Sequence, residues 1–236
     1  MGSDLYNNLI RCFVAHLKAI CDVNLTCSPM TACADKPQQT DSLQEEAPLR
    51  YYAQEWDRYT TGANYINRLF TYLNRHWVKR ERDEGRKTVY PVYTLALVQW
   101  KNNLFVPVQQ KHAKLAGAIL RLIEQQRNGE TIDQGLVKKV VDSFVSLGLD
   151  DTGTNKACLD VYKEHFENPS IEATELYYKK ESASFLAEFS VSEYLKKAEE
   201  RLKEEEGRVD RYLNTQTRKT LITANVNTSS SVSTQS

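Results

Sequence analysis

Residues Asn64–Lys87 read NYINRLFTYLNRHWVKRERDEGRK, and this stretch decides the fold expected for the whole chain. Its apolar side chains recur at the three- and four-residue spacing of an amphipathic helix. The stripe predicted to be buried consists of Ile66, Leu69, Leu73 and Trp77. Thr61-Gly62 is expected to separate this helix from the one before it, and Gly85 is expected to end it.

A neighbouring face of the same helix carries a tyrosine among long cations: Arg68, Tyr72, Arg75 and Lys79. An exposed aromatic ring flanked by arginine is the composition of a protein-binding hot spot. The alternative is a solvated helix face with one half-buried tyrosine. The pattern alone leaves both interpretations open.

The chain before this stretch also has helical spacing. Residues 4–22 predict an amphipathic helix whose stripe is Leu5, Leu9, Phe13, Leu17 and Ile20. Between Asp22 and Glu46 the periodicity disappears, which predicts a loop. A helix is expected to resume at about Pro48, because proline is tolerated in a first turn. Its aromatic stripe, predicted to be core, is Tyr52, Trp56 and Tyr59.

The chain after the stretch continues in helical patterns. Pro107 and Pro169 are each expected to begin a helix, and Asn128-Gly129 to end one. The segments that fit a capping box are Thr131-Ile-Asp-Gln134 and Ser190-Val-Ser-Glu193, and a helix is expected over about residues 155–167. No stretch predicts a pair of β-strands. The sequence therefore predicts an all-α protein of about eight helices.

The charge balance excludes several kinds of partner. The 236 residues contain 31 basic and 31 acidic side chains, so the net charge is zero. General nucleic-acid and membrane-surface binders need a net positive field, so neither partner is expected. No apolar run approaches the ~18 residues of a membrane span. The five cysteines lack metal-ligand spacing and predict free thiols in a reducing compartment, hence a cytoplasmic or nuclear protein.

Motifs for catalysis and cofactor binding are missing from the sequence. It contains no GxxxxGK[ST], GxGxxG, HExxH or GxSxG. The four histidines stand singly, without a neighbouring ligand set or triad: His16, His76, His112 and His165. We therefore expect no catalytic residue, no metal site and no cofactor.

Four blocks of sequence closely resemble the amino-terminal region of the cullins, specifically the cullin of F-box-type ubiquitin ligases. They are RYYAQEWDRY (Arg50–Tyr59), YLNRHWVKRERDEGRKTVYPVYTLALVQW (Tyr72–Trp100), LIEQQRNGETID (Leu122–Asp133) and YLKKAEERLKEEEGRV (Tyr194–Val209). The blocks stand in family order, and the resemblance covers roughly residues 5–213.

The resemblance implies a scaffold and not an enzyme. Cullins are elongated rods of stacked five-helix repeats. Their amino-terminal arm binds a Skp-type, BTB-fold adaptor and through it an F-box protein, while their carboxy-terminal part binds a RING subunit. The expected parts here are a partial first repeat over 1–87 with an adaptor-facing helix at 62–84, a second repeat over 88–188, the start of a third over 189–219, and a disordered Ser/Thr-rich tail over 220–236.

The same resemblance places Tyr72 and Arg75 on an adaptor-docking helix, with Arg68 and Lys79 extending the contact. Relative to the family pattern, the chain is expected to be truncated at both ends. It would lack the first two helices and the RING-binding region, leaving apolar surface uncovered near Leu5–Ile20 and Trp56. Two hypotheses follow: an adaptor-binding scaffold arm, or a non-catalytic helical interaction or dimerisation module that has lost adaptor binding.

Overall fold

The computed structural model describes residues 2–21, 41–110, 114–149, 158–188 and 190–221. Within these ranges every regular element is helical and there is no β-strand, which confirms the all-α prediction. The chain divides into two compact units. Unit 1 comprises Met1–Ile119 and Val145–Leu159, and unit 2 comprises Leu120–Phe144 and Asp160–Ser236. The repeat boundaries and the rod shape stay predictions.

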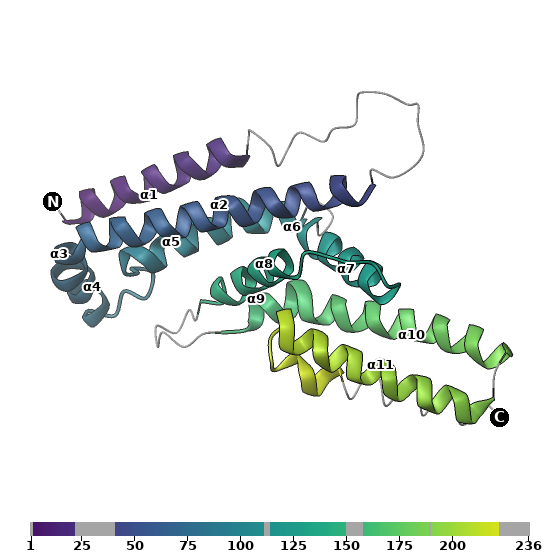
Figure 1. The fold of residues 1–236 in the computed structure, drawn as a ribbon. Helices are drawn as coiled ribbons and strands as arrows, with labels where there is room; N and C mark the ends of the chain where they lie inside the picture. Colours follow the sequence, from purple (N-terminus) through teal and green to yellow (C-terminus); the bar gives the residue numbers. More distant parts are fainter. Residues whose placement is uncertain (1, 22–40, 111–113, 150–157, 189, 222–236) are drawn as a thin grey trace. The chain divides into compact units, whose positions relative to one another are not determined.

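Unit 1 is organised around a long helical segment that α1 and α2 both contact. That segment is α5 (Val92–Trp100), the π-helical η3 (Lys101–Phe105) and α6 (Val106–Gln110). The two long helices are α1 (Gly2–Ile20) and α2 (Asp41–Leu69), and each packs on α5 (Figure 1). Along the chain, α2 is followed by α3 (Thr71–Leu73), the π-helical η2 (Asn74–Val78) and α4 (Lys79–Asp83), and then by α5.

Trp100 is the centre of the unit 1 core. It is fully buried, and the rings of Tyr52, Trp56 and Tyr59 lie 4.9 to 5.7 Å from it, centroid to centroid. The Tyr59 hydroxyl donates to the Ala96 carbonyl at 2.8 Å, so this buried polar group is satisfied. The predicted aromatic core is therefore confirmed. Trp56, which was expected to be uncovered, is buried.

The boundaries of α2 correct two predictions. The helix begins at Asp41, seven residues before Pro48, and it continues through Thr61-Gly62 to Leu69. The adaptor-facing helix therefore does not begin at residue 62. A glycine inside a helix costs about 1 kcal/mol relative to alanine. The helix nevertheless continues past Gly62, and its buried face extends to Ala63. The helix end predicted at Gly85 is confirmed, because α4 ends at Asp83 and Gly85 has φ +90°.

Pro107 and Pro169 do not begin helices, which corrects the prediction for both. Each lies in a continuous helical run, two residues after a π-helical segment: η3 in unit 1 and η4 (Lys163–Glu167) in unit 2. Proline cannot donate to the carbonyl four residues earlier and its ring crowds that group. For Pro107 this carbonyl belongs to Asn103, and the Cys21 thiol lies 3.7 Å from it as a weak donor.

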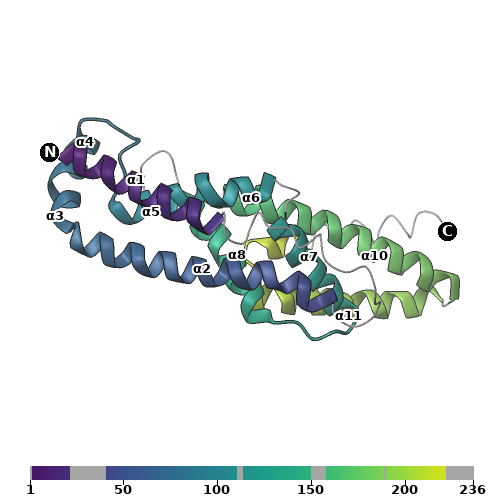
Figure 2. The same ribbon diagram turned by 90° about the horizontal axis from the view of Figure 1, so that it is seen from above.

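Unit 2 contains the second half of α7 (Lys114–Arg127), α8 (Gln134–Ser146) as far as Phe144, α9 (Asp160–Tyr162), η4, α10 (Asn168–Glu188) and α11 (Val191–Tyr212). α10 and α11 run alongside each other (Figure 2). The helix expected over 155–167 begins at Asp160, and residues 150–157 lie outside the described ranges. Residues 220–221 are helical, and the rest of the predicted tail is not described.

One capping prediction holds and one is wrong. Ser190 and Glu193 form a full capping box at the start of α11, as predicted. At α8 the capping residue is Asp133 and not Thr131, because the Asp133 carboxylate accepts from the Leu136 amide at 3.0 Å. The predicted helix stop at Asn128-Gly129 is confirmed: α7 ends at Arg127, and Gly129 has φ +95°.

A buried ion cluster lies among α7, α10 and α11. The Glu205 carboxylate accepts from Arg127 Nε at 2.8 Å, from Arg208 Nη1 at 2.8 Å and from the Tyr178 hydroxyl at 2.6 Å. Burial by itself would raise the pKa of Glu205, but the charges of Arg127 and Arg208 and the hydrogen bonds donated by Arg127 and Tyr178 hold that pKa below its ordinary value.

Candidate protein-binding site

The stretch singled out in the sequence is a broken helix. Phe70 leaves the helical conformation at φ −94°, ψ 25°, which ends α2 at Leu69. The Thr71 hydroxyl donates to the Arg68 carbonyl at 2.6 Å and satisfies a group that the break would otherwise leave open. The wider turn of η2 follows directly. Together the break and the wide turn change which side chains of this stretch face solvent.

Two asparagines hold the broken stretch on the first turn of α5. Asn74 Nδ2 donates to Asn67 Oδ1 at 2.9 Å. The two side-chain oxygens then accept from the amides of Val92 and Tyr93, at 3.0 and 3.2 Å respectively. These amides have no partner within α5, so the asparagines cap it from another part of the chain. Sequence periodicity did not indicate this role.

The outward face of the break is apolar. Tyr65, Leu69 and Tyr72 have exposed fractions of 63%, 80% and 76%. Leu69 was predicted to lie in the buried stripe, and that prediction is wrong because Leu69, one turn after the exposed Tyr65, lies on the solvent side of α2. Leu5 on α1, also expected in a buried stripe, is exposed as well, and Tyr6 is buried in its place.

A groove of about 760 Å³ lies beside these residues, and Tyr72 lines it. Other lining residues that sequence reasoning did not assign to a site are Leu5, Leu69, His76, Trp77 and Arg80. The His76 ring lies 4.2 Å from the Tyr72 ring, and Trp77 packs on Tyr6 of α1 at 5.0 Å. An open apolar groove with an aromatic rim is typical of a protein-binding surface.

The three predicted cations do not line this groove, but each of them directly precedes in the chain a residue that does. Arg68, Arg75 and Lys79 are all exposed, and none has an ion-pair partner among the described residues. Arg80, by contrast, contacts both Glu81 and Glu84. The geometry therefore offers an apolar centre with unpaired positive charge at its edge, the usual layout of a binding patch with a polar rim.

Other kinds of site are missing from the described part of the chain. No group of three or more His, Cys, Asp or Glu side chains there could hold a metal ion. None of its helices combines the length and the apolar character needed to cross a membrane.

Comparison with known proteins places these features in a family. The family model for the cullin alpha solenoid domain matches residues 1–230. The chain belongs to the cullin family. It is 41% identical to Cullin-1 of Dictyostelium discoideum over 222 residues and 36% identical to Cullin-1 of Caenorhabditis elegans over 230 residues, in each case covering 94% of this chain. Cell division control protein 53 of Saccharomyces cerevisiae is 34% identical over 176 residues, 75% of this chain.

These matches confirm the family resemblance drawn from the four sequence blocks. The chain spans about a quarter of the length of the cullins it matches, at 26%, 27% and 21% of the three proteins. What the comparisons show for this chain is thus the helical solenoid and its family.

Proposed function

We propose that this chain is the adaptor-binding part of a scaffold in an SCF-type cullin–RING ubiquitin ligase, acting in ubiquitin-dependent protein catabolism in the cytoplasm or nucleus. A Skp-type, BTB-fold adaptor binds to it and carries the F-box protein. The observation that supports this function best is the Tyr72 ring, held in an exposed position at the edge of an apolar groove.

In this proposal Tyr72 and Arg75 are the principal contacts. The tyrosine supplies a large apolar surface and a hydroxyl, and the arginine a planar set of hydrogen-bond donors. Arg68 and Lys79 extend the contact at its edge. The groove between Tyr72 and Leu5 accommodates apolar side chains of the adaptor, because its lining is mostly aliphatic and aromatic.

Isothermal titration calorimetry of the full chain with a purified Skp-type adaptor tests this proposal. Tyr72→Ala and Arg75→Glu should each weaken binding by about 2 kcal/mol if the contact is desolvated. Lys18→Glu, an exposed cation on α1 outside the groove, is the matched control and should bind like wild type. Equal affinity of wild type and Tyr72→Ala would place the contact elsewhere. No binding by a folded wild type would favour the interaction or dimerisation module.

We further propose that the chain is not catalytic. The matched region is the helical solenoid, and the resemblance assigns RING binding to another part of a cullin. In a reaction with E1, E2 and a RING protein, adding the chain should leave the rate of ubiquitin discharge at the RING-only background. A rate above that background would contradict this part of the proposal.

A further inference from the structure

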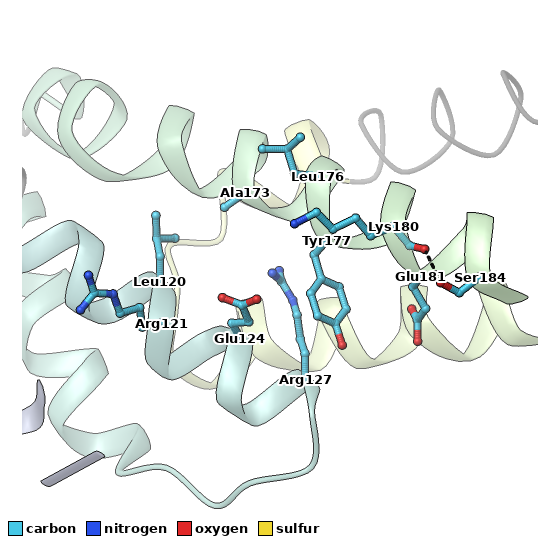
Figure 3. A pocket seen from close by; sticks show the side chains of 10 residues that line it. All are labelled: Leu120, Arg121, Glu124, Arg127, Ala173, Leu176, Tyr177, Lys180, Glu181 and Ser184. Carbon is cyan, nitrogen blue, oxygen red and sulfur yellow. Dashed lines mark hydrogen bonds between the residues drawn. The ribbon is translucent and has the colours of Figure 1, made fainter. Parts of the chain in front are cut away.

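A second hollow, of about 480 Å³, lies between α7 and α10 within unit 2 (Figure 3). Each of its walls carries both signs of charge: Glu124 and Arg127 on α7, and Lys180 and Glu181 on α10. These charges select no particular partner. The groove beside Tyr72 in unit 1 differs, because contacts from a distant part of the chain hold one of its walls in place.

Trp77 belongs to that wall, and α1 packs on its indole ring. The Tyr6 ring of α1 lies 5.0 Å from the Trp77 ring, centroid to centroid. Gly2 precedes Tyr6 by one helical turn, and a Cβ atom at Gly2 would lie 2.5 Å from Cδ1 and 2.6 Å from Cγ of Trp77. Carbon atoms that are not bonded to each other are most stable at about 3.5–4.0 Å. Because glycine has no Cβ, the first turn of α1 can lie directly against the indole.

The Tyr6 hydroxyl attaches α1 to a third segment, the residues just before α5. It donates to the Tyr90 carbonyl at 3.1 Å and accepts from the Tyr90 amide at 2.9 Å, so it satisfies both backbone groups of one residue. Two residues later, the Val92 amide donates to Asn74 of η2, the same turn that carries Trp77. The three segments α1, 90–92 and η2 therefore hold one another in place.

These contacts also determine where the rim of the groove lies. His76 directly precedes Trp77 in η2, and its ring lies 4.2 Å from the Tyr72 ring. A displacement of the η2 turn therefore displaces the ring on which Tyr72 packs. Side chains that are fixed before a partner arrives lower the entropic cost of binding it.

We propose that Gly2 and Tyr6 are positioning residues of the adaptor site. Tyr6 is buried and Gly2 has no side chain, so both act through Trp77, by fixing the wall of the groove and the η2 turn. The effect on affinity rests on the proposed adaptor binding. The position of Trp77 does not, because it is measured on the chain alone.

Fluorine NMR of the full 236-residue chain labelled with 5-fluorotryptophan tests the position of Trp77. The chain has three tryptophans, and Trp77→Phe identifies the signal of Trp77. Gly2→Ala adds one methyl group against the indole, and Tyr6→Phe keeps the ring but removes both hydrogen bonds. Each change should shift or broaden the Trp77 signal and leave the signals of the buried Trp56 and Trp100 in place. An unchanged Trp77 signal in either variant would overturn the role of that residue.

Calorimetry with a purified Skp-type adaptor measures the effect on binding. Gly2→Ala and Tyr6→Phe should each weaken binding about three- to tenfold, the effect of ordering one or two side chains on binding. Gly62→Ala is the matched control for Gly2, because a Cβ atom at Gly62 meets nothing within 4 Å. Tyr59→Phe is the control for Tyr6, because it removes a buried hydrogen bond to the Ala96 carbonyl in the core of the same unit. Both controls should bind like wild type.

The two measurements separate this proposal from the proposed function. If the wild type binds no adaptor while the Trp77 signal responds to both variants, the proposed function fails and the placement of the groove wall by Gly2 and Tyr6 is supported. If the wild type binds and both variants bind equally well, their role in the adaptor site is overturned. It is also overturned if Tyr59→Phe weakens binding as much as Tyr6→Phe, since the effect is then a general loss of stability.

Discussion

Arginine has opposite settings in the two units. In unit 2, Arg127 and Arg208 are buried, and both donate to the same carboxylate, that of Glu205. In unit 1, Arg68 and Arg75 are exposed, and no described acidic residue pairs with either. A buried charge must be paired, because leaving it alone costs several kcal/mol, whereas an exposed charge costs nothing to keep unpaired. The comparison separates arginines that maintain the fold from arginines that are available to a partner.

The largest expected effect breaks the buried side of this comparison. Arg127→Met leaves Glu205 with one arginine in place of two, and because Arg208 and Tyr178 still donate to it, the cost should fall below the roughly 3–5 kcal/mol of leaving a buried charge unpaired. Hydrogen exchange measured by mass spectrometry should show faster exchange in α10 and α11. Lys203→Ala, which removes an exposed pair with Glu199, is the control and should leave that exchange unchanged. Equal exchange in wild type and Arg127→Met would mean that the cluster does not stabilise unit 2.

Acid should weaken the same cluster by a smaller amount. The pKa of Glu205 is lowered in the folded chain, so its contribution to stability is present above the pKa of an unfolded glutamate, about 4.3. That contribution is lost as the pH falls through the lower, folded pKa. Unit 2 of the wild type should therefore lose amide protection on acidification. Glu205→Gln should show a flatter dependence on pH between about 5 and 2, and identical slopes would contradict the assignment.

The elements whose positions follow from local chemistry were predictable from the sequence. The apolar face of α8, the capping box at Ser190 and the stops at Gly85 and Gly129 depend on residues within one or two turns of each other. The candidate site was partly predictable for the same reason. Tyr72, Arg75, Arg68 and Lys79 are each exposed within one short stretch, and their role in binding a partner stays a prediction.

The missed features depend on contacts between distant segments. Leu69 was predicted to be buried because helical spacing was extended through Phe70, where the helix breaks. The sequence predicts helix starts at Pro107 and Pro169, since nothing in the spacing reveals the π-helical segment before each proline. The role of Asn67 and Asn74 rests on amides 18 and 26 residues further along the chain. Tertiary structure decides such cases, and local pattern does not contain it.

The asparagine pair gives a prediction of intermediate size in unit 1. Asn74→Ala removes the acceptor for the Val92 amide and the donor to Asn67, and loss of a helix cap costs about 1 kcal/mol. Fluorescence reports on unit 1, because Trp56, Trp77 and Trp100 all lie there. The unfolding midpoint of Asn74→Ala should therefore fall. Asn64→Ala, an exposed asparagine one turn before Asn67, is the control and should unfold like wild type.

The smallest expected effect concerns the exposed cations, and it tests the other side of the comparison. If Arg68 and Lys79 serve a partner and not the fold, the double variant Arg68→Ala/Lys79→Ala should unfold at the wild-type midpoint, because neither side chain has an ion pair to lose among the described residues. Its association with a Skp-type adaptor should slow by about two- to fivefold, since edge charges act mainly on the association rate. Added salt should reduce the difference in association rate between wild type and the double variant, because exposed charges are screened beyond about 10 Å at an ionic strength of 0.1 M. Stopped-flow or surface plasmon resonance at two salt concentrations measures both quantities. A lowered unfolding midpoint with an unchanged association rate would mean that these cations, like Arg127, stabilise the fold.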